Sequence, residues 1–398
     1  MNASRGHWAL AIAGAAILAI TMGIRQSLGL FVSPLNTSTG LGIVTISFTL
    51  AVGQFVWGAA QPAFGALADR VGNVRVIGAG AVLLAAGLVG TTLVDSSIGL
   101  LLFLGILTTA GAGAGSFSIL MSAAANRLPP ERRSTASGFI NAGGSFGQFV
   151  FAPLSQALIA AFGWVVALWA LAATALATIP MALAFRETPG EAKPVHAAGP
   201  SLGAQVREAF RDPSYLCLHA GFFTCGFHIA FLVTHLPGEV GLCGLPASVG
   251  AASLAIIGLG NIAGSLGAGW LGQHYRMKWI LFAMYASRGV AILIYLALPK
   301  TEATFYAFAV VLGMTWLATV PPTAGLVGKL FGVRYLATLF GFTLLSHQVG
   351  AFFGAWLGGL AIDRTGSYDW MWYADAALAF AAALVNLPIR EARVAKPA

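Results

Sequence analysis

Three basic side chains, Arg25, His228 and His347, stand inside long apolar stretches of the sequence. An arginine guanidinium can bind a carboxylate through two parallel hydrogen bonds. A histidine can supply a positive charge that switches near neutral pH, or it can carry a proton. These residue types predict recognition of an anion rather than covalent chemistry.

Motifs for covalent chemistry are missing from the sequence. There is no phosphate-binding glycine loop, no Ser/His/Asp pattern and no pair of carboxylates within an apolar stretch. Cys217, Cys225 and Cys243 have the spacing of neither a disulfide framework nor a metal site, and the first two are expected to pack as small apolar residues. We therefore expect no enzyme activity, no cofactor, no bound metal and no transport driven by ATP.

The elements that position these side chains are helices that cross a membrane. Only 9% of the residues are charged, 58% are hydrophobic, and the mean hydropathy is +0.83, whereas a soluble domain is about one quarter charged. Several apolar stretches are long enough to cross the ~30 Å hydrocarbon core as helices. The first, from Trp8 to about Val32, is too long for a signal-peptide core and is expected to remain as the first helix.

Hydropathy and turn residues predict twelve such helices. They cover residues 8–32, 42–66, 75–95, 98–125, 135–161, 163–185, 214–236, 246–271, 279–298, 303–328, 336–362 and 369–388. The predicted domains are an N-terminal six-helix bundle (1–185), a polar linker (186–213) and a C-terminal six-helix bundle (214–398). Within the linker, residues 201–210 could form a short amphipathic turn capped by Ser201, or the whole segment could be irregular.

Basic residues gather on one side of these helices. Arg25 and Arg288 lie inside predicted helices, Lys300 and Arg364 lie in loops on one side, and the remaining 17 of the 21 Lys and Arg lie on the other side. The positive-inside rule places both termini in the cytoplasm, in a multi-pass protein of the plasma (inner) membrane. The basic charge is therefore a topology signal, and nucleic acid is not an expected partner.

The two halves of the sequence repeat each other. GFINAGGSFGQF (138–149) matches GFTLLSHQVGAF (341–352) at an offset of 203, and 65–75 matches 269–279 at an offset of 204. Two six-helix halves related by duplication are typical of alternating-access transporters, whose substrate site lies between the halves.

The segment GALADRVGNVRV (65–76) resembles a loop of the major facilitator superfamily, which the chain resembles along its whole length. That loop joins helices two and three and reads Gly-x-Leu-x-Asp-Arg-x-Gly followed by basic residues. The matching positions are Gly65, Leu67, Asp69, Arg70, Gly72 and Arg75. The resemblance implies an all-α polytopic membrane protein with twelve transmembrane helices in two pseudo-symmetric six-helix bundles, the major facilitator fold.

The resemblance also gives this loop a role as a conformational latch. Asp69 is expected to accept hydrogen bonds from the N-terminus of helix eleven when the cytoplasmic side is closed, while Gly65 and Gly72 permit close helix approach and a tight turn. The second copy carries Gln273 and His274 instead, so its latch should be weaker. The latch residues are Gly65, Asp69, Arg70, Gly72 and Arg75. Alternatively, the two arginines only mark topology.

Three segments are similar to the monocarboxylate and oxalate–formate carriers: IRQSLGLF (24–31), GAGAG (111–115) and the run NAGGSFG (141–147). The helix-four arginine of proton-linked drug exporters is missing near Leu107 and Thr108. The monocarboxylate carriers' Asp and Arg in helix eight are also absent, since Asn261 and Ser265 stand there.

The resemblance implies candidate substrate-binding residues. Arg25 is close to where monocarboxylate carriers hold a basic residue in helix one, although a snorkelling arginine near the helix end is the alternative. His228 lies within helix seven, and His347 could replace a basic residue of the oxalate–formate carriers in helix eleven; each could instead be a neutral histidine bonded between helices. Neutral contacts, in the cavity or between helices, are expected from Gln54, Gln61, Asn141, Gln148, Trp316 and Thr319.

Arg288 is the most deeply placed cation, and we expect a structural role for it, with Asp375 as partner. Asp375 is the one acidic residue that we expect inside a spanning helix, which leaves the cavity basic and suited to an anion.

These features predict a secondary active transporter of a small organic anion, expected to be a carboxylate, that works by rocker-switch alternating access. A proton or a counter-anion could be coupled to it, and the lipid bilayer is the other partner. Two alternatives remain: an exporter of amphipathic drugs or metabolites, and a non-transporting membrane sensor or assembly factor. A sensor is expected to carry a soluble signalling domain, and none is recognisable.

Overall fold

Helices make up the described part of the chain, which in the computed structural model comprises residues 3–117, 119–120, 130–186, 201–332 and 335–391, and no strand occurs there. The side chains of residues 3–7, 69, 130–137 and 337 lie outside that description. An all-helical backbone fits a lipid environment, because a helix pairs its own N–H and C=O groups.

The first half of the chain begins with a long composite helix. The elements of this half are α1 (Ala3–Ser27), η1 (Leu28–Phe31), α2 (Val32–Thr39), α3 (Ile43–Val71), α4 (Asn73–Thr91), α5 (Ser97–Leu100), η2 (Leu101–Thr108), α6 (Thr109–Ala114), α8 (Pro130–Leu176), α9 (Thr178–Ala182) and η3 (Leu183–Phe185). The long α8 is not straight, because Gly163 has φ 80° and ends one helix and begins the next.

The second half begins after the short α10 (Leu202–Ala209). Its elements are α11 (Pro213–Leu242), α12 (Ala247–His274), α13 (Met277–Ala297), α14 (Glu302–Thr315), α15 (Val320–Phe331), α16 (Leu336–Thr365) and α17 (Asp369–Asn386). The predicted tenth helix is thus interrupted between α14 and α15, where residues 316–319 form a turn. The predicted seventh helix is longer than expected and includes Glu239.

These helices supply twelve crossings of the membrane. Nine helices within the described residues are long and apolar enough to span it. One of them, residues 138–185, breaks at Gly163 and accounts for two crossings. The long helices α16 and α17 provide the remaining two, which confirms the expected all-α fold of twelve transmembrane helices.

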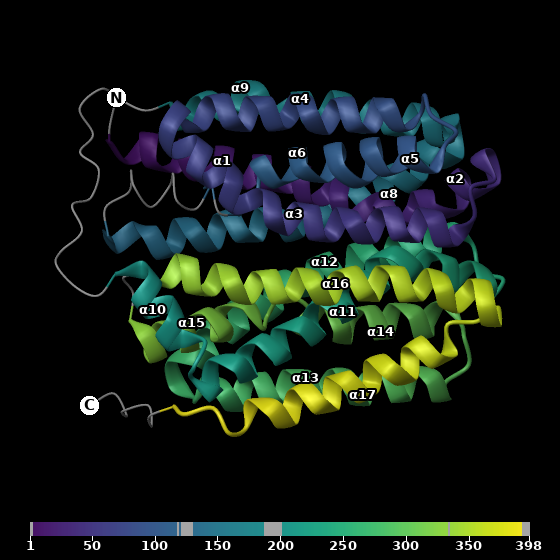
Figure 1. Ribbon diagram of the computed structural model, residues 1–398. Coiled ribbons are helices and arrows are strands. Elements are labelled where there is room, and N and C mark those ends of the chain that lie inside the picture. Colours follow the sequence, from purple (N-terminus) through teal and green to yellow (C-terminus); the bar gives the residue numbers. More distant parts are fainter. Residues whose placement is uncertain (1–2, 118, 121–129, 187–200, 333–334, 392–398) are drawn as a thin grey trace.

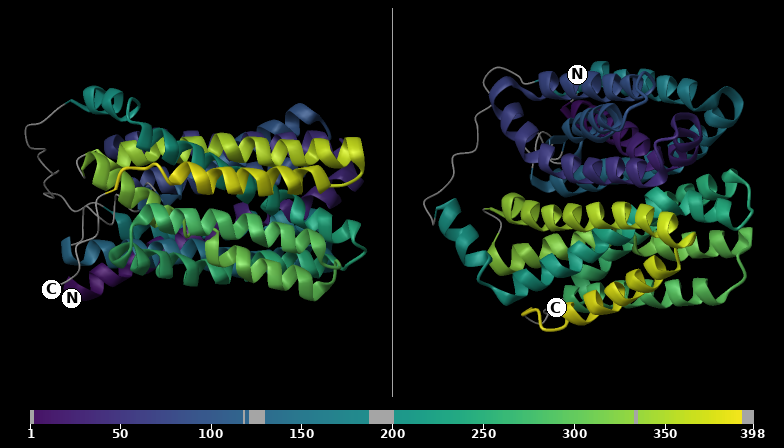
Figure 2. Two further views of the ribbon diagram at one scale, coloured as in Figure 1. Left: turned by 90° about the horizontal axis from the view of Figure 1, so that it is seen from below. Right: turned by 45° about the vertical axis from the view of Figure 1, so that its right-hand side comes forward.

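The helices of the two halves form two side-by-side groups, purple to blue and teal to yellow (Figures 1 and 2). One end of both groups carries the basic residues Arg70, Arg75, Arg276, Lys278 and Lys329, which lie at the ends of α3, α4, α12, α13 and α15. We call this the basic end. The loops with Lys300 and Arg364 lie at the opposite end.

Packing inside the halves follows the sequence repeat. A Cβ on Gly147 of α8 would lie 2.0 Å from the carbonyl oxygen of Ala19 in α1, and a Cβ on Gly350 of α16 would lie 2.0 Å from that of Phe223 in α11. Gly147 and Gly350 are 203 positions apart in the sequence, and Ala19 and Phe223 are 204 positions apart. Only glycine allows backbones to come this close, so the repeated glycines set the same helix contact in both halves.

A second packing pair occurs in both halves with its members exchanged. A Cβ on Gly23 of α1 would lie 2.5 Å from the ring of Phe151 in α8. In the second half the large residue is Phe227 of α11 and the small one is Gly354 of α16, whose Cβ would lie 2.1 Å from the Phe227 carbonyl oxygen. The helix that carries glycine therefore differs between the halves, while the two helices in contact are the same.

Close contacts between the halves are concentrated toward the end opposite the basic end. A Cβ on Gly29 of η1 would lie 1.9 Å from the carbonyl oxygen of Val233 in α11, and one on Gly359 of α16 would lie 2.4 Å from Ser47 in α3. Farther along the same helices α3 and α16, toward the basic end, no described atom lies within 4 Å of such a Cβ at Gly65 or Gly341. Among the described residues, the space beside α3 and α16 is thus filled toward one end and open at Gly65 and Gly341.

The linker helix is present as the sequence suggests. The Ser201 hydroxyl accepts a hydrogen bond from the backbone N–H of Ala204 at 3.3 Å, which caps α10. The Gln205 amide donates to the carbonyl oxygen of Phe331 at 2.7 Å and fixes α10 to the end of α15. The capped helix replaces the irregular alternative for residues 201–210.

Candidate functional site

Arg25 is buried between helices of both halves. It lies near the end of α1, but the chain continues as helix through η1 and α2 to Thr39, so the guanidinium is well inside the span. Its Nη2 donates to Oε1 of Gln54 in α3, and its guanidinium carbon lies 4.1 Å from the centroid of the Trp57 ring. Only 9% of the residue is exposed. The structure therefore contradicts the snorkelling alternative, which requires a helix end nearby.

The surroundings of Arg25 neutralise its charge incompletely. A cation over an aromatic ring gains about 0.5–2 kcal/mol, and Gln54 offers a neutral oxygen. None of the ion pairs among the described residues includes Arg25, and its Nε has no hydrogen-bond partner there. A small cavity of about 10 Å³ adjoins the guanidinium and is also lined by Val233 and Thr234 of α11. The site thus presents a partly unsatisfied cation between the halves.

The residue after Arg25 is a glutamine that bonds a second glutamine in α8. Nε2 of Gln26, the residue after Arg25, donates to Oε1 of Gln148 in α8 at 3.2 Å. The Nε2 of Gln148 has no described partner although the residue is fully buried. Asn141, seven residues earlier on α8, is half-buried. Gln148 was predicted from sequence and Gln26 was not, although the position of Gln26 beside Arg25 in the sequence is a signal.

Asn261 of α12 connects the interruption between α14 and α15 to the first half of the chain. Its Oδ1 accepts a hydrogen bond from the backbone N–H of Leu317 at 2.9 Å, inside the interruption. Its Nδ2 donates to the hydroxyl of Ser145 in α8 at 2.7 Å. Ser265, one turn along α12, also donates to Asn261 Oδ1, at 3.3 Å. One buried amide therefore joins the first half of the chain to the broken helix of the second half.

Ser145 was not among the predicted site residues. The signal that could have found it is a small polar residue within the glycine-rich run GGSFG, because such residues form hydrogen bonds between membrane helices.

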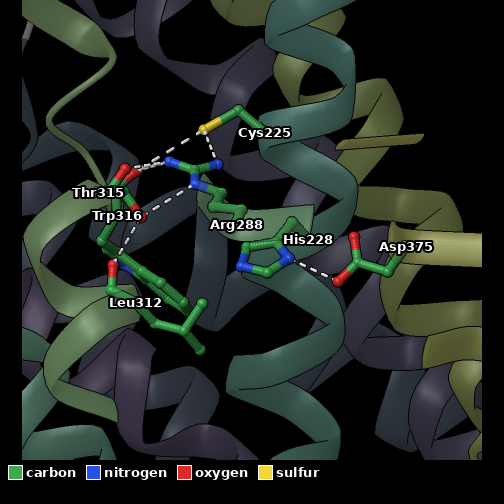
Figure 3. A network of polar contacts seen from close by, with 7 residues as sticks. All are labelled: Cys225, His228, Arg288, Leu312, Thr315, Trp316 and Asp375. Carbon is green, nitrogen blue, oxygen red and sulfur yellow. Dashed lines mark hydrogen bonds and ion pairs between the residues drawn. The ribbon is translucent and has the colours of Figure 1, made fainter. Parts of the chain in front are cut away.

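Arg288 closes the end of α14 (Figure 3). Its Nη2 donates to the carbonyl oxygens of Thr315 and Trp316, the latter at 2.6 Å, and its Nε donates to the Thr315 hydroxyl at 3.3 Å. The last carbonyls of a helix have no partner within the helix and carry partial negative charge. The arginine supplies the missing donors and the matching charge, so its contacts are structural.

The expected pairing of Arg288 with Asp375 is wrong. Asp375 of α17 instead contacts His228 of α11, with His228 Nδ1 2.5 Å from Asp375 Oδ2, and both residues are almost fully buried (Figure 3). The interruption after α14 offered Arg288 carbonyl oxygens that the sequence did not reveal.

Two further expectations need correction. Cys225 does not pack as a simple apolar residue, since its Sγ accepts from Arg288 Nη1 at 3.4 Å and lies 3.4 Å from the hydroxyl of Thr319. Asp375 is not the one acidic residue inside a spanning helix, because Glu239 of α11 is buried and accepts a hydrogen bond from the Tyr295 hydroxyl at 2.9 Å.

His347 lies on α16 and Trp316 in the turn between α14 and α15, both in the second half. The His347 ring packs 5.1 Å from that of Phe222, and its Nδ1 lies 3.2 Å from Nε2 of Gln348. The Trp316 ring is fully buried and its centroid is 6.1 Å from that of His228.

The predicted site residues therefore form two groups. Arg25 and Gln148 lie with Gln26 in the first half. His228, Trp316 and Thr319 lie around Arg288 and Cys225 in the second half. Among the described residues, no hydrogen bond, ion pair or ring contact joins Arg25 to either histidine.

The predicted latch is seen only in part. Gly72 has φ 92° and makes the expected tight turn between α3 and α4. Arg70 is exposed, and Nη1 of Arg75 donates to the carbonyl oxygen of Val71 at 3.4 Å. At Gly65, where a close helix approach was expected, no described atom lies within 4 Å of the Cβ position. The side chain of Asp69 lies outside the described residues.

Ser145→Ala should shift the balance between conformations, because it removes the Asn261 contact between the halves. A neutral hydrogen bond contributes about 0.5–1.5 kcal/mol, which corresponds to a shift of roughly two- to tenfold. Spin labels at positions 65 and 341, in a background without accessible native cysteines, should show more molecules with a short distance at the basic end. Ser155→Ala, also buried on α8, is the matched control. Identical distance distributions in wild type and Ser145→Ala would contradict this role of Asn261.

Comparison with known proteins places these features in a family. The model of the Major Facilitator Superfamily matches residues 12–354. Monocarboxylate transporter 13 of Bos taurus is 26% identical over 383 residues, which cover 93% of this chain and 86% of that protein. The oxalate:formate antiporter of Oxalobacter formigenes is 22% identical over 368 residues, which cover 92% and 86%.

Solved structures agree on the fold. A D-xylose-proton symporter superposes with a TM-score of 0.77 at 13% identity, covering 96% of this chain and 97% of that one. A bacterial homologue of the human lysosomal transporter Spinster gives a TM-score of 0.74 at 15% identity and covers 98% and 100%. The chain therefore belongs to the Major Facilitator Superfamily.

Proposed function

We propose that this protein is a secondary active transporter of a small organic anion, a carboxylate, and that it works by rocking its two halves around a central site. The observation that carries the proposal is Arg25, a buried guanidinium between the halves with an unpaired Nε and no described acidic partner. Keeping such a charge inside a membrane is costly, and an anionic ligand would relieve part of that cost.

The relatives support this substrate class. Two of them are named for monocarboxylates and for oxalate and formate, all of which are small carboxylates. The repeated packing of α1 on α8 and of α11 on α16 supports the rocking mechanism, because each half can move as a body when its internal glycine contacts are kept. We accordingly assign residues 1–185 and 214–398 to the two moving bodies and 186–213 to the linker.

Uptake by proteoliposomes tests the proposal. Purified protein should accumulate one or more labelled small carboxylates in a saturable manner, and empty liposomes should not. Parallel measurements with an imposed pH gradient, and with a carboxylate preloaded inside, separate proton coupling from exchange against a counter-anion. Saturable uptake of amphipathic cations without any uptake of carboxylates would contradict the proposal and favour an exporter of amphipathic compounds.

We further propose that the basic end faces the cytoplasm, because the positive-inside rule assigns the side richer in Lys and Arg to it. A cysteine placed at Gly190, in the linker, should then resist a membrane-impermeant thiol reagent in intact cells and react after permeabilisation. A cysteine at Ser367, in the loop between α16 and α17, should react in intact cells and serves as the positive control. Labelling of position 190 from outside would show that the protein has the opposite orientation in the membrane.

We also propose that the loop between α3 and α4 is a latch that forms when the basic end closes. Asp69→Asn should lower the maximal transport rate by several-fold while substrate affinity changes little, because the latch acts on conformation and not on the site. Transport titrations of Asp69→Asn beside Gln273→Ala, the equivalent position of the second half, measure this. If turnover is unchanged in the first variant and lost in the second, the assignment of the stronger latch to the first half is wrong.

A further inference from the structure

An apolar groove lies between α11, α16 and α17 in the second half. Figure 1 shows α16 and α17 meeting at one end of the molecule and diverging toward the basic end, with α11 visible between them. The groove has a volume of about 520 Å³ and is lined mainly by apolar side chains, among them Phe223, Val349, Leu378 and Val385. Leu378 and Val385 are seven residues apart on α17, so the groove extends about 10 Å along the helix axis.

A groove of this kind among membrane-spanning helices will not stay empty. Helices pack closely in proteins, and an apolar space of this size would forfeit many dispersion contacts. Water is a poor occupant, because it needs two or more polar partners in such a site. A hydrocarbon chain from the surrounding bilayer matches the lining.

The end of the groove nearer the basic end is polar. His219 of α11 and Ser346 of α16 both line it, and His219 Nδ1 lies 2.5 Å from the Ser346 hydroxyl. The other ring nitrogen of His219, Nε2, has no hydrogen-bond partner among the described residues. When the serine hydroxyl donates to Nδ1, Nε2 carries a hydrogen and requires an acceptor. An ester carbonyl oxygen at the top of an acyl chain is such an acceptor.

The linker helix α10 ends directly over this polar region. The ring of Phe210, which follows α10, lies 5.2 Å from the ring of His219 and 5.5 Å from that of Phe342 in α16. Arg207 of α10 and Arg211 in the turn after it are both exposed. Exposed arginines on a short amphipathic helix at the membrane surface attract anionic lipid headgroups.

A third cation borders the same place. Arg390, after α17, donates to Asp212 Oδ2 at 2.6 Å and its backbone N–H donates to Ser214 Oγ at 3.0 Å, so the chain after α17 is fixed to the start of α11. Because Asp212 is already paired with Arg390, the remaining charged residues of 201–213 are Arg207, Glu208 and Arg211, which leave a net positive charge.

We propose that an anionic phospholipid binds here, with one acyl chain in the groove, its ester region beside His219 and its phosphate at Arg207 and Arg211. This lipid would hold α10, and therefore the linker between the two halves, against the second half. The site is separate from Arg25 and does not depend on the identity of the transported substrate.

Native mass spectrometry of the purified full chain tests this site with phosphatidylglycerol and phosphatidylcholine as probes. Wild type should retain phosphatidylglycerol more tightly than phosphatidylcholine. Because each cation near a headgroup contributes about a fivefold factor in affinity, Arg207→Gln with Arg211→Gln should lower phosphatidylglycerol affinity by roughly 25-fold and leave phosphatidylcholine little changed. Arg364→Gln, an exposed arginine at the opposite end, is the control and should change neither.

A second pair of variants tests the groove itself. Ala381→Phe should fill it and displace both lipids, whereas Ala377→Phe, an exposed alanine of α17 outside the groove lining, should not. Should Ala381→Phe elute as an aggregate, Val385→Trp provides the same obstruction. Equal affinity for the two lipids in wild type, or phosphatidylglycerol retention unaffected by the two glutamines or by the groove-filling variant, would overturn the proposal. Loss of substrate uptake in Ala381→Phe with unchanged lipid retention would overturn it as well and identify the groove as a substrate path.

Discussion

Arg25→Gln is expected to weaken binding of a small carboxylate by roughly ten- to a hundredfold. A hydrogen bond to a charged group contributes about 1.5–3 kcal/mol, and the guanidinium Nε has no hydrogen-bond partner among the described residues. Glutamine keeps a polar contact to Gln54 but removes the charge. The effect should appear in the concentration for half-maximal transport or in a binding titration on equally folded protein.

Arg25→Lys separates charge from geometry. Lysine keeps the positive charge and loses the fork that binds both oxygens of a carboxylate, so the loss of affinity should be moderate. Arg364→Gln at the opposite end removes an exposed arginine and should leave affinity unchanged. If Arg25→Gln binds the carboxylate as well as wild type does, Arg25 is not the anion site. A preference of the wild type for cationic substrates would lead to the same conclusion.

Arg288→Leu is expected to destabilise the protein by about 2–6 kcal/mol. The carbonyl oxygens of Thr315 and Trp316 lose their donor, and each buried carbonyl left without a partner costs roughly 1–3 kcal/mol. Leucine removes the desolvation cost of a buried charge, which by itself can favour the apolar variant, but it cannot satisfy the end of α14. The carbonyl penalty should therefore prevail.

Thermal unfolding in detergent measures this effect, with size-exclusion chromatography as the method that monitors how much folded protein remains at each temperature. Arg288→Lys should lose part of the stability, because an ammonium group can still donate to a carbonyl. Thr315→Val removes the side-chain hydroxyl bonded to Arg288 and leaves both carbonyl contacts, so its effect should be within about 1 kcal/mol. An unchanged unfolding midpoint in Arg288→Leu would show that α14 ends without help from this arginine.

Regular features of the fold could be predicted from sequence because they follow from periodic composition. The twelve helices result from apolar length, the two halves from repeated segments, and the cap of α10 from Ser201 before an amphipathic turn. Helix ends were less accurate, since a spanning helix can continue into polar residues when tertiary contacts satisfy them. Glu239 is such a case: its bond to Tyr295 allows α11 to continue past the predicted end.

The partners of the buried polar groups could not be predicted, because they depend on where a helix breaks. At the turn formed by residues 316–319, Arg288 bonds the carbonyl oxygen of Trp316, and Asn261 bonds the N–H of Leu317. Asp375 is therefore not the partner of Arg288 and contacts His228 instead. Hydropathy alone predicts one continuous helix over residues 303–328, because the residues of the interruption are apolar. The nearby prolines, Pro321 and Pro322, lie in the first turn of α15, where proline is compatible with a helix. The site was therefore predicted as a set of residue types and not as a set of contacts.

The exchanged packing pair has a consequence for how the duplication is recognised. Gly23 corresponds to Phe227, and Phe151 corresponds to Gly354, so a position-by-position comparison of the halves scores two mismatches between a very small and a very large residue. In space each half places one glycine against the partner phenylalanine, which meets it with the Phe151 ring in the first half and with the Phe227 backbone in the second. What the duplication preserves there is a close approach of two helices, which neither column of such a comparison contains by itself.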